Sequence, residues 1–172
     1  TPLFFISLIL TLFYSIPFVR LRSKFLINTL TGLILYGLLS PLAGWALYPA
    51  NPIPVEMIVF LLILGTGIAI TKDFEDVHGD QLYNIRTFPT VFGEQKAAMI
   101  VKILLITSFI YIFILSVLSI IDLKYLILLI FTPWILYIIF TMNTASNNKM
   151  FFVKNVLLVI SIESCIIAAT LI

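Results

Sequence analysis

Six long apolar runs, separated by short polar breaks, decide what this chain can fold into. Of its 172 residues, 62% are hydrophobic and 10% are charged. A soluble domain of this size cannot bury so much apolar side chain, whereas roughly 17–25 apolar residues in a helix cross a bilayer. We therefore predict an all-α fold, a polytopic transmembrane helical bundle that forms a single domain over residues 1–172. The expected spans are about 1–17, 25–48, 55–71, 97–120, 125–142 and 151–172.

Glycine and proline residues predict how the second and fifth spans are shaped. The second span contains Gly32, Gly37 and Gly44, a spacing of small residues that lets neighbouring helices approach closely. Pro41 in the same span and Pro133 in the fifth lack the backbone N–H that an α-helix uses. We therefore expect a kink at each proline.

The basic residues lie almost entirely on one side of the predicted membrane. If six spans alternate, nine of the ten Lys and Arg residues fall on the side of the loops after the first, third and fifth spans. These nine are Arg20, Arg22, Lys24, Lys72, Arg86, Lys96, Lys102, Lys149 and Lys154, and only Lys124 lies opposite. Because cytoplasmic loops are rich in Lys and Arg, we expect a multi-pass protein of the cell membrane with these loops in the cytoplasm.

One of these loops also holds half of the chain's carboxylates. Four of the eight Asp and Glu residues lie between positions 73 and 80. If this stretch is helical, Asp73, Asp76 and Asp80 share one face. A like-charge pair at ~4 Å costs about 1 kcal/mol in water and about 4 kcal/mol at an effective dielectric constant of ~20. A bound divalent cation removes that repulsion, and oxygen ligands suit Mg²⁺ or Ca²⁺.

Carboxylates and basic side chains on the same side of an apolar bundle predict a site for a phosphate-rich anion. A metal held by carboxylates, together with Arg and Lys, binds phosphate oxygens. The apolar helices behind such a site suit a hydrophobic tail. The substrate class predicted from these features is an isoprenoid diphosphate.

Two motifs resemble those of a known family. Lys72-Asp73-Phe74-Glu75-Asp76-Val77-His78-Gly79-Asp80, followed by Ile85-Arg86-Thr87-Phe88-Pro89 and Gly93, resembles the second aspartate-rich motif of the UbiA-type intramembrane prenyltransferases. Tyr14-Ser15-Ile16-Pro17 with Arg20-Leu21-Arg22 is similar to the Tyr-Ser-x-Pro loop that lies two helices earlier in that family. The longer motif is most similar to that of the digeranylgeranylglyceryl phosphate synthases, and it also resembles the homogentisate-type aromatic enzymes.

The resemblance implies a fold, a reaction and a set of site residues. The fold would be a bundle of nine helices around a cavity, of which this chain resembles the last six. The reaction would be Mg²⁺-dependent transfer of a prenyl group from a prenyl diphosphate to an acceptor. The implied metal ligands are Asp76 and Asp80, which are also catalytic, with Asp73 as a third ligand or an outer partner. The implied diphosphate-binding residues are Lys72, Arg86, Tyr14, Arg20 and Arg22.

The chain also departs from the family pattern. The family's first motif, Asn-x-x-x-Asp-x-x-x-Asp, occurs nowhere in these 172 residues and would lie upstream of Thr1. We therefore expect that this chain carries half of a metal site, and that it is inactive alone.

Several alternatives and partner predictions accompany this interpretation. The acceptor could be geranylgeranylglyceryl phosphate or an aromatic quinone or tocopherol precursor. A cation-coupled transporter and a non-catalytic membrane scaffold are alternatives of other classes, although transporter sites usually lie near the bilayer midplane. We expect a prenyl diphosphate donor, a lipophilic or aromatic acceptor and membrane lipid as partners, with no nucleic acid and no protein partner. His78 is expected at the surface, and Glu163 in a polar contact between helices or facing the interior.

Overall fold

The computed structural model describes residues 2–16, 24–46, 55–142 and 151–171. These residues form helices and no strand, which confirms the all-α prediction. The elements are α1 (Pro2–Ser15), α2 (Ile27–Gly32), the π-helix η2 (Leu33–Leu39), α3 (Ser40–Trp45), α4 (Val55–Glu75), α5 (Val77–Leu82), α6 (Phe88–Phe92), α7 (Glu94–Val117), the 3₁₀-helix η3 (Leu123–Phe131), α8 (Thr132–Thr141) and α9 (Phe151–Leu171).

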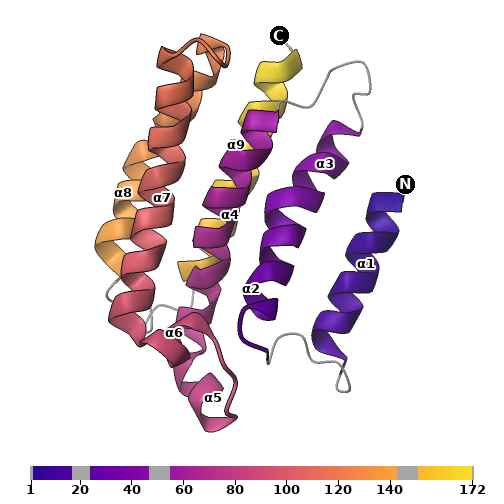
Figure 1. Ribbon diagram of the computed structural model, residues 1–172, viewed down its shortest axis with the longest axis vertical. Helices are drawn as coiled ribbons and strands as arrows, with labels where there is room; N and C mark the ends of the chain where they lie inside the picture. The colour runs from indigo at the N-terminus through magenta and orange to yellow at the C-terminus, as the bar shows by residue number, and fades with distance from the viewer. Residues whose placement is uncertain (1, 17–23, 47–54, 143–150, 172) are drawn as a thin grey trace.

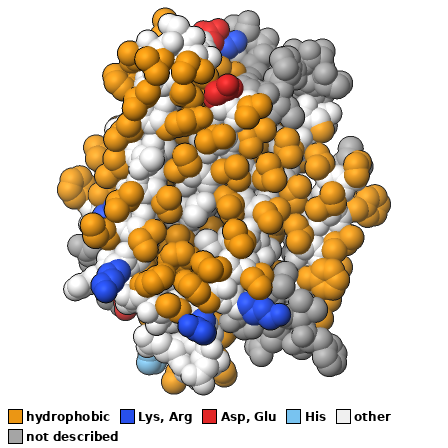
Figure 2. All heavy atoms as spheres, viewed as in Figure 1, with side chains coloured by type: hydrophobic (Ala, Val, Ile, Leu, Met, Phe, Trp, Pro, Cys, Tyr) orange, Lys and Arg blue, Asp and Glu red, His pale blue; other side chains and the backbone are white. Residues whose placement is uncertain are grey.

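Four stretches of the described chain are long and apolar enough to cross a membrane. They are Ile27–Trp45, Val55–Glu75, Glu94–Val117 and Leu123–Thr141. Apolar helical stretches in α1 and α9 are shorter, at Pro2–Tyr14 and Leu157–Ala169. Hydrophobic side chains cover most of the face shown in Figure 2, as expected for a surface that meets lipid rather than water.

Helix α4 is the centre of the bundle. In Figure 1 it lies between the α2–η2–α3 span and α7, with α9 behind it, and its largest interhelical contacts are with α7, η2 and α9. Its inward side chains, including Phe60, Leu61 and Leu64, are buried in the core. The first part of the acidic stretch, with Asp73 and Glu75, is therefore carried by the helix that the rest of the bundle surrounds.

Close packing between the second span and its neighbours confirms the role predicted for the glycines. A Cβ added to Gly37 would lie 3.2 Å from the Leu61 carbonyl oxygen of α4, and one added to Gly32 would lie 3.1 Å from the Ala69 Cβ. A Cβ on Gly44 would lie 3.0 Å from Ile167 of α9. These contacts hold the α2–η2 segment against α4.

Both internal prolines coincide with a change of helix type. The π-helix η2 precedes Ser40 and Pro41, and the 3₁₀-helix η3 precedes Thr132 and Pro133. Because proline has no backbone N–H, the carbonyl one turn earlier loses its α-helical hydrogen-bond partner, and the preceding turns adopt another hydrogen-bond pattern. From each proline onwards the chain is α-helical, in α3 and in α8.

The acidic stretch is not one continuous helix. Helix α4 ends at Glu75, Asp76 has φ −106° and ψ 6°, and α5 starts at Val77. Carboxylates are unfavourable at the negative C-terminal end of a helix and favourable at the positive start of the next one. The break therefore places Asp76 and Asp80 at the start of α5 and not at the end of α4. The common face expected for Asp73, Asp76 and Asp80 in one continuous helix is interrupted.

Helices α5 and α6 form a cap at the end of the bundle where α1 ends and α2 begins (Figure 1). The start of α6 is closed by a capping box, in which the Thr87 backbone N–H donates to Thr90 Oγ1 at 2.7 Å. Helix α7 follows at Gly93, which has φ 83° and ψ 151°, a conformation open almost only to glycine. Lys and Arg side chains gather towards this end in Figure 2.

Candidate functional site

A ring of hydrogen bonds joins the tyrosine motif to the acidic motif. Lys72 Nζ donates to the Tyr14 hydroxyl at 2.9 Å, and the Tyr14 hydroxyl donates to Asn28 Oδ1 at 2.7 Å. Asn28 Nδ2 donates to both carboxylate oxygens of Asp73, at 3.1 and 3.3 Å. Because Lys72 and Asp73 are adjacent on α4, these contacts close a ring across α1, α2 and α4.

The Lys72 side chain also lies over the aromatic ring of Tyr14. Its Nζ is 4.8 Å from the ring centroid, within the range of a cation–π contact. The phenol therefore holds the ammonium group both by its oxygen and by its ring face. This arrangement places the Lys72 ammonium group near the buried Asp73 carboxylate. Tyr14 and Asn28 connect the two charged groups.

A cavity of about 140 Å³ adjoins this ring between α1, α2 and α4. Tyr14, Asn28 and Lys72 line it together with Thr11, Thr29, Gly32, Leu35 and Ala69. This volume has room for several water molecules or a small headgroup. A cationic and hydrogen-bonding wall of this kind suits phosphate oxygens.

A second cavity of about 440 Å³ lies in the α5–α6 cap and contains two more of the expected site residues. Asp80, Gln81, Asn84, Ile85, Arg86, Thr90 and Val91 line it. Asp80 is only 3% exposed, whereas Arg86 is exposed. The Ile85 N–H donates to the Asp80 carbonyl at 2.8 Å, and Asn84 has φ 53° in the turn between them. After this turn, Arg86 reaches the cavity that Asp80 lines.

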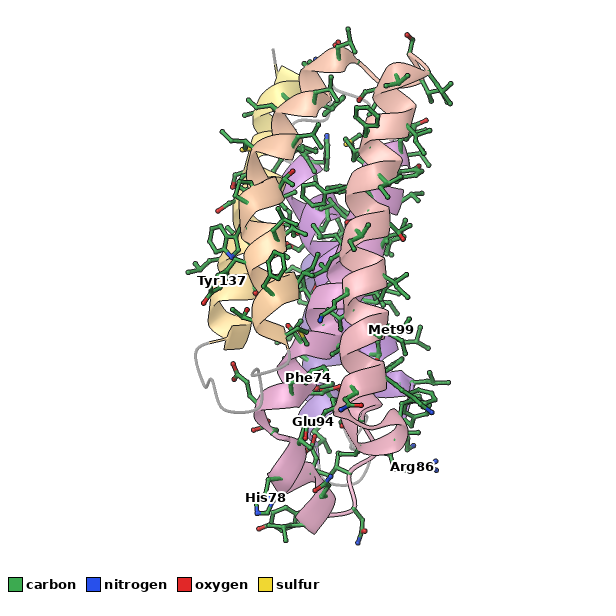
Figure 3. All side chains as sticks on the ribbon, turned by 90° about the vertical axis from the view of Figure 1, so that its left-hand side faces the viewer. Phe74, His78, Arg86, Glu94, Met99 and Tyr137 are labelled. Atoms are coloured by element: carbon green, nitrogen blue, oxygen red, sulfur yellow. The ribbon has the colours of Figure 1, made fainter. Side chains whose placement is uncertain are left out.

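The end of α4 thus presents its residues to different neighbours. Lys72 faces α1 and α2, whereas Phe74 lines a third cavity of about 480 Å³ with Glu94, Gln95, Ala98 and Met142. In Figure 3, the buried Phe74 lies near the exposed Glu94 at this end of the bundle, with His78 at the outer tip and Arg86 at the edge. The surface position predicted for His78 is confirmed.

Comparison with known proteins identifies the family. The model of the UbiA prenyltransferase family matches residues 1–158. This chain belongs to the UbiA prenyltransferase family. Its membrane-spanning, all-helical structure agrees with that membership.

Curated relatives of this UbiA-family chain carry two kinds of name. A digeranylgeranylglyceryl phosphate synthase of Methanobrevibacter smithii is 35% identical over 89 residues, which cover 51% of this chain and 31% of the relative. A probable chloroplastic homogentisate phytyltransferase 2 of Oryza sativa subsp. japonica is 30% identical over 119 residues, covering 64% and 31%. A homogentisate phytyltransferase of Synechocystis sp. is 32% identical over 99 residues, covering 53% and 32%.

The match therefore spans about a third of the length of these relatives. No solved structure matches the chain significantly. The family assignment rests on the family model and on these relatives.

The oxygen atoms that this UbiA-family chain offers as metal ligands suit Mg²⁺. The described residues do not surround a metal ion by themselves. Within the described ranges, no group of three His, Cys, Asp or Glu side chains is arranged to hold a metal ion. Asp73 is turned towards Asn28, Asp80 lines the cap cavity, and Asp76 is exposed at the break between α4 and α5. Mg²⁺ is usually held by one or two carboxylates with substrate phosphates and water, so these oxygen donors fit it.

The structure brings some expected site residues together and adds one that the sequence analysis missed. Tyr14, Lys72 and Asp73 meet in the ring, and Asp80 and Arg86 share the cap cavity. Arg20 and Arg22 lie outside the described residues. Asn28 was missed, although an asparagine near the start of an apolar span is costly in lipid and is a usable signal.

Glu163 makes the helix–helix contact that was expected. The Ser40 hydroxyl of α3 donates to Glu163 Oε2 of α9 at 2.9 Å. This contact lies within the spans, far along the chain from the acidic motif. It connects α3 to α9.

Proposed function

We propose that the complete protein transfers a prenyl group from a prenyl diphosphate to a lipophilic acceptor in a Mg²⁺-dependent reaction. The observation that carries this proposal is the placement of Lys72 and Tyr14 on a cavity next to the Asp73 carboxylate, at the end of an apolar bundle. The cation and the phenol suit a diphosphate, and the spans suit its hydrocarbon tail. Membership of the UbiA prenyltransferase family supports the same reaction.

The residues of this chain would act mainly on the departing diphosphate. The C–O bond between the prenyl carbon and the diphosphate breaks with its electron pair leaving on oxygen, and the acceptor nucleophile then bonds to the allylic carbon and loses a proton. Lys72 and Arg86 would neutralise the developing negative charge, and the Tyr14 hydroxyl, which accepts from Lys72 and donates to Asn28, would hold the Lys72 ammonium group in place. Bound Mg²⁺ would add Lewis-acid stabilisation of the same charge.

Asp76 and Asp80 are the proposed metal-binding and catalytic carboxylates, and Asp73 is the third ligand or outer partner. Asp80 is buried against the cap cavity that Arg86 shares, which supports a joint role on the diphosphate. Arg20 and Arg22 would complete the site from the loop after α1. The acidic motif would face the cytoplasm, as the clustering of basic residues around it suggests.

For the acceptor, we propose geranylgeranylglyceryl phosphate first. The relative named digeranylgeranylglyceryl phosphate synthase has 35% identity over its matched region and supports this choice. An aromatic quinone or tocopherol precursor is the second candidate, because two other relatives are named homogentisate phytyltransferases.

The test uses the complete protein in lipid nanodiscs with Mg²⁺ and labelled geranylgeranyl diphosphate. We would offer geranylgeranylglyceryl phosphate and homogentisate in parallel and identify products by mass spectrometry. A prenylated product with either acceptor supports the proposed reaction and identifies the acceptor class.

A thermal-shift assay separates the enzyme from the other two classes. We expect a prenyl diphosphate to stabilise the protein only when Mg²⁺ is present. A cation-coupled transporter or a scaffold would show no such protection. Absence of both product and protection would refute the proposed function.

A further inference from the structure

Asn28 occupies an unusual position between two expected site residues. It is only 7% exposed, one residue into α2, and its side-chain amide contacts Tyr14 of α1 and Asp73 of α4. A buried amide is costly in a membrane span unless its polar atoms are paired. Here the amide oxygen accepts one hydrogen bond and the amide nitrogen donates to both oxygens of a carboxylate.

The neighbours of Asn28 fix which way its amide points. If the amide were reversed, its oxygen would face the acceptor oxygens of Asp73, and this contact would be repulsive. The donors therefore run in one direction, from Lys72 through Tyr14 and Asn28 to Asp73. Hydrogen bonds aligned from a cation to an anion polarise and strengthen one another.

Helix packing brings Asn28 within reach of Asp73. Gly32 lies one turn further along α2, where a Cβ would come within 3.1 Å of Ala69 on α4. Lys72 and Asp73 are neighbours on α4, so their side chains leave the helix about 100° apart. Tyr14 and Asn28, from two other helices, fill the space between those two charges.

We infer that Asn28 is a positioning residue for prenyl transfer, an inference that rests on the proposed function. It holds the Asp73 carboxylate in one orientation and holds the Tyr14 phenol at the wall of the adjoining cavity. A diphosphate thus meets a carboxylate, a phenol and an ammonium group that are already arranged. Asn28 acts on the reaction through Asp73 and Tyr14.

A double-mutant cycle in the complete protein tests whether Asn28 acts through Asp73. Asn28→Leu removes both hydrogen bonds at similar side-chain volume, and Asp73→Asn removes the charge. We expect Asn28→Leu to lower kcat/KM for the prenyl diphosphate by roughly 10- to 100-fold and to raise the Mg²⁺ concentration for half-maximal activity, as for other partners that orient a metal site. In the Asp73→Asn background, we expect Asn28→Leu to cost several-fold less than in the wild type, because only the part that acts through Tyr14 remains.

A binding measurement supplies a second readout that does not depend on turnover. A prenyl S-thiolodiphosphate resists ionisation, so its Mg²⁺-dependent binding can be measured by calorimetry. We expect Asn28→Leu to weaken this binding roughly tenfold or more. If Asn28→Leu gives no folded protein, Asn28→Ser, which is too short to bridge both partners, should show the same loss.

Asn155→Leu is the matched control. Asn155 is a buried asparagine of α9 whose Nδ2 donates to Thr71 Oγ1 of α4 at 3.2 Å, next to the ring and outside it. Its replacement should lower thermal stability and leave the Mg²⁺ dependence and analogue binding unchanged.

Two different failures can be told apart. If the wild-type protein neither binds the analogue nor makes product, the proposed function fails and the inference about Asn28 fails with it. If the wild type is active but the fold-losses in kcat/KM of Asn28→Leu and Asp73→Asn multiply in the double variant, only the positioning role is refuted. The same holds if Asn155→Leu shifts the Mg²⁺ dependence as much as Asn28→Leu does.

Discussion

The two cavities that hold the expected site residues are built in different ways. The α1–α2–α4 cavity, of about 140 Å³, takes its polar wall from residues far apart in the chain, since Lys72 and Tyr14 are separated by 58 positions and Asn28 and Asp73 by 45. The cap cavity, of about 440 Å³, is lined entirely by described residues between Asp80 and Val91. The first is assembled by helix packing and the second by local turns.

This difference has a consequence for how each cavity responds to mutation. In the first cavity, side chains bond to side chains of other helices, so any change in helix separation disturbs it. In the cap cavity, the Ile85 N–H bonds to the Asp80 carbonyl and the Thr90 hydroxyl closes the start of α6. Its geometry depends on backbone turns, and packing within the spans should affect it little.

The largest expected effect comes from the carboxylates of the acidic motif. Asp80→Ala or Asp76→Ala in the complete protein should reduce Mg²⁺-dependent turnover at least about a thousandfold, because metal-bound charge stabilisation is worth several kcal/mol. Steady-state rates across a Mg²⁺ titration measure this.

Asp122→Asn is the control for that experiment. Asp122 is an exposed carboxylate near the other end of the bundle, where its Oδ1 accepts from the Lys124 N–H at 3.1 Å. It should leave turnover unchanged. Unchanged rates in both the Asp76 and Asp80 variants would refute the proposal that these carboxylates bind the metal and that the cap cavity takes part in the reaction.

A smaller loss is expected from Tyr14→Phe in the first cavity. The substitution keeps the ring under Lys72 and removes the hydroxyl that joins Lys72 to Asn28. A hydrogen bond to a charged group contributes about 1.5–3 kcal/mol, so kcat/KM for the prenyl diphosphate should fall roughly 10- to 100-fold.

The change should appear mainly in KM for the prenyl diphosphate, measured at saturating acceptor. Tyr83→Phe, at an exposed tyrosine just after α5, is the control and should have no effect. If the two phenylalanine variants behave alike, the first cavity does not bind the donor.

Gly37→Ala tests the dependence of the first cavity on helix packing. The added Cβ would lie 3.2 Å from backbone atoms of Leu61 and Leu62, and backbone atoms have little freedom to move away. We expect a destabilisation of about 1–3 kcal/mol, measured by denaturant unfolding in detergent, together with weaker donor binding.

Gly79→Ala is the comparison, because a Cβ there would meet nothing within 4 Å and Gly79 lies in helix α5. It should be neutral or slightly stabilising. If Gly79→Ala destabilises the protein as much as Gly37→Ala, tight packing between η2 and α4 does not explain the effect at Gly37.

The smallest effect is expected from Thr90→Val in the cap. This change removes the acceptor of the Thr87 N–H and should lower stability by about 1 kcal/mol. Hydrogen exchange should increase at the start of α6 and remain unchanged in α2. Thr107→Val, at an exposed position of α7, is the control. Faster exchange in α2 would show that the cap and the first cavity are coupled.

Much of the fold followed from apolar runs and from the positions of glycine and proline. The helical class, the close contacts at Gly32 and Gly37 and the contact of Glu163 were predicted and are confirmed. The break at Asp76 was not predicted, because the common face of Asp73, Asp76 and Asp80 holds only for one continuous helix. Sequence spacing did not predict the contact between Asp73 and Asn28.

The sequence by itself determined that the chain is a helical membrane protein with a concentrated set of acidic and basic groups, because hydrophobic length and charge placement are properties of the chain alone. Only the tertiary structure decided that Asn28 stands between Tyr14 and Asp73, and that Asp80 belongs to a separate cavity. Contacts between distant helices depend on how closely and in which rotation those helices pack. Spacing along one helix carries no information about the side chains that another helix places opposite.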